Sequence, residues 1–488
     1  MTMNGDDEWL IDWRCKSFPP LAEGTPASQI GEAKWDLLTD FTTPVAALQE
    51  SALAHNLDRM RSYCAEHGVR IAPHGKTTMS PELIRRQLEH GAWAMTAATA
   101  WQARAMLTFG VPRVIIANEC IDPVGLQWIV HYMWVNRDAE VYVFVDSIDA
   151  VEAMRTAIQE SVARARRPRN LSSATPSELA TSATDGARSM LDRISAPSGD
   201  PASGGFPGFP GFPPVARPIP VLVEVGVVGG RAGVRDVSTA VAVGRAVAHA
   251  PELELAGVGC FEGVLGGRRV PEVVEPVREF LRTTRRVGEE LMDADAFRAE
   301  RPVILTAGGS AFFDQVVDVF TADREQYRRP VEVVIRSGCY VTHDHSTYRE
   351  ASPFRSAGES DFVPAMQVWS RVLSTPEPGL AIIDAGKRDI STDARMPLVL
   401  GRWRDGVYQP FGDGTGDDDA GGAASVIVDR FNDQHGYVQM TGAGTPPLRV
   451  GDLVALGISH PCTTFDKWRV IPVVDDERHV VGAVRTFF

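Results

Sequence analysis

The chain has 488 residues, with 63 acidic and 49 basic side chains and a formal net charge of −14. This length is enough for one large barrel and a second domain, and the acidic balance argues against a nucleic acid or an anionic membrane as partner. The six cysteines are scattered, the N-terminus has no signal pattern, and no apolar run approaches the roughly 20 residues that span a bilayer, so we expect a soluble cytoplasmic protein.

Short apolar runs alternate with stretches of helical period in the first two thirds of the chain. The expected strands are 69–72, 94–97, 113–117, 141–145, 221–225, 255–260, 303–306 and 331–335, and the clearest expected helices are 81–90, 98–109, 148–165 and 237–250. Continuous apolar strands are typical of a parallel sheet that is covered on both faces. The pattern predicts an α/β fold, a (β/α)₈ TIM-type barrel, with an open doubly wound sheet as the alternative.

Beyond residue 350 the pattern changes to short strands with little helical period. The expected strands are 365–373, 380–384, 424–428, 436–440, 453–457 and 470–474. We therefore predict a barrel over 43–350 and a C-terminal all-β domain over 351–488, against which the segment 1–42 packs. Residues 168–218, rich in Ser, Ala, Pro and Gly, are expected to form a flexible insertion. The acidic stretch 412–422 does not match a calcium-binding loop and is expected to be a solvated loop.

Lys76 is the first candidate for chemistry. It lies between an apolar strand and a helix that begins with Ser80, in the run Ala-Pro-His-Gly-Lys-Thr-Thr-Met-Ser. An amine at the mouth of a barrel can form a Schiff base with an aldehyde. A surface lysine in a loop is the ordinary alternative, but the neighbouring His74 and Gly75 favour a site.

Two glycine-rich runs follow the last two strands of the expected barrel. The candidate residues are Gly308, Gly309 and Ser310 after the seventh strand, and Ser337, Gly338 and Tyr340 after the eighth. Backbone N–H groups in such loops bind phosphate, although tight turns use the same residue types. A phosphate site opposite a reactive lysine suggests pyridoxal phosphate.

His460 and Cys462 are the candidate metal ligands. On an extended segment, residues two apart face the same side, and an imidazole with a thiolate suits Zn²⁺. A buried histidine beside a structural cysteine is an equally good interpretation of this pair. His343 and His345 form a second candidate by spacing, although a role lining the pocket is favoured for them.

These runs, together with the segment 224–234 that contains Arg231, resemble the family of D-serine dehydratase and D-threonine aldolase. The resemblance implies an alanine-racemase-like barrel of the third fold type of pyridoxal phosphate enzymes, followed by a β domain. It implies that Lys76 is the Schiff-base lysine beside His74, that the two glycine-rich runs hold the phosphate, and that His460 and Cys462 bind zinc. Val225 and Gly226 depart from the family's more acidic pattern, which leaves Arg231 or Tyr340 as the expected partner of the cofactor's ring nitrogen.

The resemblance implies a pyridoxal phosphate- and zinc-dependent lyase that acts on a D-3-hydroxy amino acid such as D-serine or D-threonine. Relatives that cleave threonine tend to have a carboxylate where this chain has Cys462, which favours β-elimination to a 2-oxo acid and ammonia. A D-threonine-type aldolase that yields glycine and an aldehyde, a racemase, and a non-catalytic carrier of pyridoxal phosphate are the alternatives. Barrels of this type pair, so we expect a homodimer.

Overall fold

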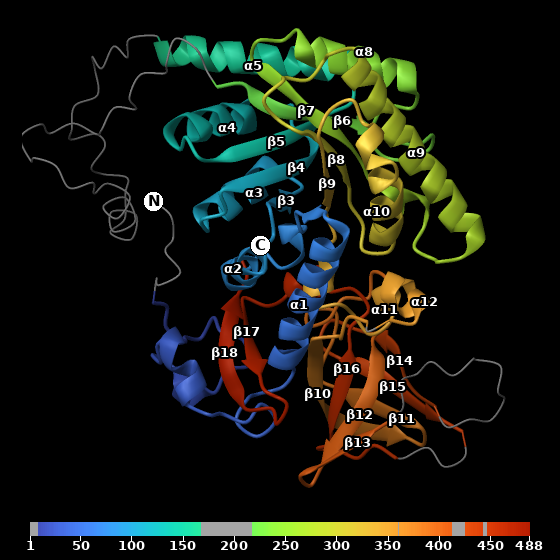
Figure 1. Ribbon diagram of the computed structural model, residues 1–488. Coiled ribbons are helices and arrows are strands. Elements are labelled where there is room, and N and C mark those ends of the chain that lie inside the picture. Colours follow the sequence, from blue (N-terminus) through green and yellow to red (C-terminus); the bar gives the residue numbers. More distant parts are fainter. Residues whose placement is uncertain (1–7, 167–216, 360, 412–424, 443–446) are drawn as a thin grey trace, which may run out of the picture.

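The computed structural model describes residues 8–166, 217–359, 361–411, 425–442 and 447–488. A barrel of parallel strands stands above an antiparallel β domain, and the helix α1 (Glu50–His67) runs between them (Figure 1). Apart from 217 and 218, the expected insertion 168–218 lies outside the described residues. The expected acidic loop 412–422 also lies outside them.

The eight expected barrel strands are all present and all parallel. They are β2 (Arg70–Ile71), β3 (Met95–Ala97), β4 (Arg113–Glu119), β5 (Glu140–Val145), β6 (Ile219–Val225), β7 (Leu253–Cys260), β8 (Val303–Ala307) and β9 (Val331–Ile335). The two edge strands, β2 and β3, meet where Trp93 N–H donates to Ile71 O at 2.8 Å and Thr96 N–H to Pro73 O at 2.7 Å. The prediction of a (β/α)₈ barrel is confirmed, and this closure excludes the open sheet.

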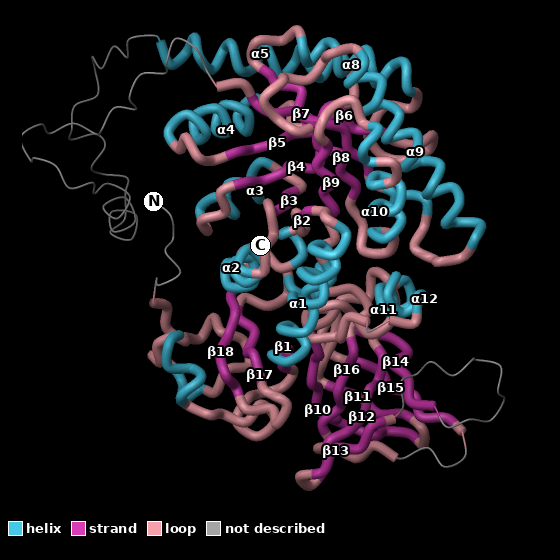
Figure 2. Tube along the Cα trace, viewed as in Figure 1, coloured by secondary structure: helices cyan, strands magenta, loops and turns pink. Residues whose placement is uncertain are grey.

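Helices cover the outside of this barrel (Figure 2). They are α2 (Pro81–Glu89), α3 (Ala100–Thr108), α4 (Pro123–Val135), α5 (Ile148–Arg166), α8 (Val237–Ala248), α9 (Pro271–Asp293) and α10 (Phe313–Thr321). The helix α2 begins where the sequence indicates, because the Ser80 side chain accepts from Leu83 N–H and Pro81 occupies the first turn. Short helices α11 (Thr347–Ala351) and α12 (Pro353–Ala357) lead into the β domain.

The second sheet contains the six strands expected after residue 350 and four more. Its strands are β1 (Val45–Gln49), β10 (Met366–Glu377), β11 (Leu380–Ile383), β12 (Leu398–Arg404), β13 (Val407–Pro410), β14 (Ser425–Phe431), β15 (Gly436–Thr441), β16 (Leu453–Gly457), β17 (Val470–Val474) and β18 (Val480–Arg485). The strands β10, β11, β15, β14, β12 and β16 pair in a closed ring, and β1, β17 and β18 extend it. The predicted all-β domain is confirmed.

The start of the chain belongs structurally with this second sheet. The strand β1 pairs with β10 and β17, whereas the sequence analysis placed residues from 43 onward in the barrel. Before β1, Trp9 and Trp35 pack on a core shared with β10 and β17, while Trp13 is exposed. In the described part of the chain, no helix is long and apolar enough to cross a membrane.

Candidate functional site

Lys76 lies in a single turn at the carboxyl end of β2. This turn is the 3₁₀ helix η3 (Gly75–Thr77), and the preceding Ala72 carbonyl accepts from Thr96 Oγ1 at 2.6 Å. Gly75 has no room for a side chain, since a Cβ there would lie 2.6 Å from the terminal carbon of Met106. Lys76 is partly buried, and within the described part of the chain its amine makes no hydrogen bond or ion pair. The amine is therefore available for another bond.

The two glycine-rich loops come together beside this turn. Ser337 Oγ donates to Gly309 O at 2.7 Å and so joins the loop after β8 to the loop after β9. A Cβ on Gly338 would lie 2.7 Å from both Cβ and O of His74, so this close approach requires glycine. The structure thus brings Lys76, His74 and both predicted loops to one end of the barrel.

The loops suit an anion. In the described ranges, the backbone N–H groups of Gly309, Ser310 and Gly338 make no hydrogen bond to the protein, so they remain available to phosphate oxygens. Next to them lies Arg336, a fully buried guanidinium that donates to Thr306 Oγ1 at 2.7 Å and to the Cys260 carbonyl at 2.8 Å. Residues 308–310 and 337–338 are therefore suitable for a phosphate group.

Arg336 was not singled out from the sequence. Its Nε is buried and has no partner among the described residues, and its guanidinium lies 5.2 Å from the Phe144 ring centroid. A cation directly after an apolar barrel strand is the signal that could have identified it, because such residues are rarely buried without a function. Its charge adds to that of Lys76 at the barrel mouth.

The other predicted cofactor residues, His74, Arg231 and Tyr340, differ in burial and in their neighbours. His74 has a buried Nδ1 with no partner among the described residues; burial lowers its pKa, as does the charge of Lys76, so the ring is neutral. Arg231 is exposed, with its guanidinium 4.7 Å from the Phe261 ring centroid. Tyr340 is buried in the core, with its ring centroid 5.9 Å from that of Phe362. The two candidates for the ring nitrogen therefore lie in different surroundings.

A pair of carboxyl groups lies at the ends of β4 and β6. Burial raises the pKa of Glu224 to about 9, and a hydrogen bond with Glu119 raises it further, so Glu224 carries the shared proton at neutral pH. The shared proton leaves the pair with one negative charge instead of two, beside the positive charges of Arg231 and Arg336.

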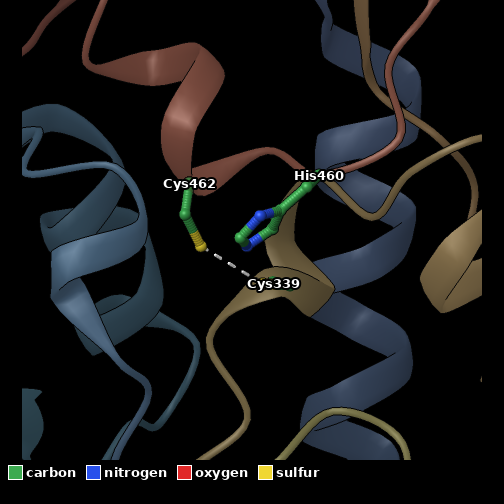
Figure 3. Close-up of side chains that lie close together, drawn as sticks. All are labelled: Cys339, His460 and Cys462. Atoms are coloured by element: carbon green, nitrogen blue, oxygen red, sulfur yellow. Dashed lines mark hydrogen bonds between the residues drawn. The ribbon is translucent and has the colours of Figure 1, made fainter. Parts of the chain in front are cut away.

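A metal-ligand cluster lies where the barrel meets the β domain. It consists of Cys339, His460 and Cys462, whose ligand atoms all lie within 4.8 Å of one another (Figure 3). Cys462 begins the short helix α13 (Cys462–Phe465), and Cys339 begins the 3₁₀ helix η6 (Cys339–Val341) after β9. Two thiols and an imidazole are the donors that zinc prefers, so the residues present suit this ion.

Neighbouring groups hold this cluster in place. His460 Nδ1 hydrogen-bonds Asp393 Oδ2 at 2.7 Å, which leaves its Nε2 for a ligand. Burial lowers the pKa of His460, but Cys462 and Asp393 outweigh this and raise it to about 9. A hydrogen bond from Cys339 lowers the pKa of Cys462 well below its usual value, which favours the thiolate. Asp393 was missed in the sequence because no motif surrounds it.

The second metal candidate takes no part in this cluster. His343 and His345 are buried, and burial lowers the pKa of each to about 3, so both rings are neutral. His343 packs on Phe362, and His345 packs against Gly457. The cluster found among the described residues contains neither histidine.

One contact joins the two halves of the site. Cys462 Sγ and Thr77 Oγ1 lie within hydrogen-bond distance, at 3.4 Å, and Thr77 is the residue after Lys76. The C-terminal end of the chain supports the same turn, because Phe487 N–H donates to Met79 O at 3.1 Å and Arg485 Nε donates to Glu82 Oε1 at 2.9 Å. The lysine turn, the two glycine-rich loops and the cluster of Cys339, His460 and Cys462 therefore form one continuous site.

Comparisons with known proteins show which sequences and folds this chain resembles. Residues 365–474 match a family model described as a putative serine dehydratase domain. Over 460 residues the chain is 22% identical to the D-threonine aldolase of Arthrobacter sp, covering 94% of this chain and 93% of the relative.

Solved structures show the same fold. The D-threonine aldolase from Filomicrobium marinum has a TM-score of 0.65 at 21% identity, covering 92% of this chain and 96% of that one. The D-threo-3-hydroxyaspartate dehydratase from Delftia sp. HT23 has a TM-score of 0.62 at 18% identity, covering 93% and 99%. A cysteine mutant of such a dehydratase is described in a metal-free form. The expected resemblance to the D-serine dehydratase and D-threonine aldolase family is confirmed.

Proposed function

We propose that this chain is a pyridoxal phosphate- and zinc-dependent lyase that acts on a D-3-hydroxy amino acid by β-elimination and releases a 2-oxo acid and ammonia. The observation that carries the proposal is the 3.4 Å contact between Cys462 and Thr77, which puts the metal ligands beside the lysine turn. A reaction that removes a proton at Cα and an oxygen at Cβ needs a base and an oxygen-binding cation side by side, and Lys76 and the bound metal would supply them.

Each part of the site has a distinct task. Lys76 would hold the aldehyde of pyridoxal phosphate, and the loops at 308–310 and 337–338 would hold its phosphate. When bound, the cofactor supplies an electron sink for the pair left at Cα, and the zinc supplies a Lewis acid for the β-oxygen. Nζ of Lys76 would take the Cα proton.

The elimination step breaks two bonds of the substrate, Cα–H and Cβ–O, and the later release of ammonia breaks Cα–N. Hydrolysis of the resulting enamine gives the 2-oxo acid and ammonia. Hydroxide is a poor leaving group at neutral pH, which is why the residues that hold the metal matter for this outcome. His74, kept neutral by its burial, can hydrogen-bond without adding charge beside Lys76.

Cleavage of Cα–Cβ by a retro-aldol reaction is the second candidate. It is favoured by the match to D-threonine aldolase, which covers nearly the whole chain. It uses the same lysine and cofactor, so the residues around Lys76 do not discriminate between the two reactions. The thiolate of Cys462, a softer ligand than a carboxylate, favours zinc and with it the elimination.

Product analysis tests the proposal. The purified protein, loaded with pyridoxal phosphate and zinc, is incubated with single D- and L-isomers of serine, threonine and 3-hydroxyaspartate. We expect ammonia and a 2-oxo acid in equal amounts from a D-isomer and neither product from its L-isomer. Formation of glycine and an aldehyde would show that the chain is an aldolase and would overturn the proposal. If the loaded protein turned over none of the isomers, the chain would be a non-catalytic carrier of the cofactor.

A further inference from the structure

Cys339 lies in the loop that the sequence analysis assigned to phosphate binding, yet its sulfur faces the metal ligands. Its Sγ is 3.6 Å from Cys462 Sγ, and both cysteines are free thiols. With Zn–S bonds of about 2.3 Å, two thiolates on one tetrahedral zinc ion lie about 3.8 Å apart. The two sulfurs are thus already at the separation that a shared zinc ion requires.

The three side chains converge from two parts of the fold. Figure 3 shows Cys462 and His460, from the β domain, directed toward Cys339, which follows the last barrel strand. Cys339 is 5% exposed. A buried thiol that only filled space would be surrounded by apolar side chains, whereas Cys339 contacts a second thiol.

Residues around the cluster contact the side chains of the proposed ligands. Asp393 orients His460, and Thr77 Oγ1 lies within hydrogen-bond distance of Cys462 Sγ, so two of the three ligands have a polar neighbour that fixes their direction. Such contacts are the usual support of a functional metal site. Tyr348 packs edge-on against His460, with ring centroids 6.1 Å apart.

We infer that Cys339 is a third protein ligand of the metal, so that this chain binds zinc through two thiolates and one imidazole. The inference rests on the proposed function, because the metal is the one that the elimination requires. Three protein ligands leave one position of a tetrahedral ion for substrate or water, which is the pattern of a catalytic zinc. Two thiolates also select zinc over harder ions such as Mn²⁺ and Mg²⁺.

Counting the sulfur ligands tests this directly. X-ray absorption at the zinc edge of the loaded wild-type protein should show two sulfur atoms per zinc, and Cys339→Ser should show one. Loss of a residue that orients a ligand already weakens metal binding by about 10–100-fold, so the zinc affinity of Cys339→Ser should fall by more than about 100-fold. The matched control Cys64→Ser removes another buried thiol, on α1, and should leave both readouts unchanged.

The outcomes separate this inference from the proposed function. One sulfur per zinc in the wild-type protein, or wild-type zinc affinity in Cys339→Ser, would overturn the role of Cys339 whatever the activity. If Cys339→Ser fails to fold, the wild-type sulfur count still decides. Two sulfurs per zinc in a protein that releases no ammonia from any isomer would keep the ligand set and overturn the elimination. Manganese bound as tightly as zinc would overturn the predicted selectivity.

Discussion

The barrel mouth and the metal-ligand cluster are neighbours of opposite character. The mouth contains the cations Lys76 and Arg336, whereas the cluster contains the thiols Cys339 and Cys462 and the carboxylate of Asp393. The mouth therefore suits the phosphate of a cofactor, and the cluster suits a cation. The site therefore consists of two halves with different ligands. A substitution can alter one half while ligand binding by the other half is measured.

The largest expected effect comes from the mouth. Lys76→Ala removes the amine that would hold the cofactor and take the Cα proton, so turnover should fall by about 10⁴-fold or more. Borohydride reduction followed by peptide mapping should label Lys76 in the wild-type protein and nothing in the variant. Zinc content should stay the same, which shows that the variant is folded and the cluster intact. Labelling of a different lysine in the wild-type protein would contradict the assignment.

The cluster should respond to a change that leaves the mouth untouched. Asp393→Asn weakens the hydrogen bond that orients His460, so zinc affinity should drop by about 10–100-fold while cofactor binding is unchanged. Competition with a chelator measures the zinc affinity. Asp433→Asn is the control, because the Asp433 side chain forms an exposed ion pair with Arg388 at 3.2 Å, away from the cluster. Equal affinities in Asp393→Asn and the control would show that Asp393 does not act through His460.

The mouth was easier to predict from sequence than the cluster. Each barrel strand is a contiguous apolar run, and parallel strands place their carboxyl ends together, so Lys76 and the glycine-rich loops could be assigned to one end. Cys339 precedes Cys462 by 123 residues and lies in another part of the fold, and no local pattern indicates that they meet.

The same reasoning explains which strands were missed. All four residues of β13 are exposed, so the strand has no apolar periodicity to detect. The apolar run of β1 was visible, but its partners β10 and β17 lie more than 300 residues later in the chain. The hydrophobic pattern of a segment predicts whether it is a helix or a strand. Only long-range packing decides to which sheet a strand belongs.

The contact between the loop after β9 and the lysine turn should be sensitive to one methyl group. In Gly338→Ala the new Cβ would meet His74 at 2.7 Å, and because part of the contact is backbone, the loop must shift. We expect a loss of about 1–3 kcal/mol in the free energy of unfolding and weaker phosphate binding. Urea denaturation and titration with pyridoxal phosphate measure the two effects. Gly267→Ala, where a Cβ meets nothing within 4 Å, should change neither.

The last expected effect concerns the pH dependence of stability. The pKa of Glu224 is raised to about 9 by burial and by Glu119, so between its unfolded pKa and this value the folded state keeps a proton that the unfolded chain releases. The free energy of unfolding should therefore fall as pH rises through this window, by up to about 1.4 kcal/mol per pH unit. Glu224→Gln cannot titrate, so its stability should fall less between about pH 6 and about pH 8. The control Glu279→Gln removes an exposed carboxylate on α9 and should follow the wild-type slope. Parallel slopes in the wild type and Glu224→Gln would mean that the pair holds no proton at neutral pH, and its second negative charge would then make the mouth less positive.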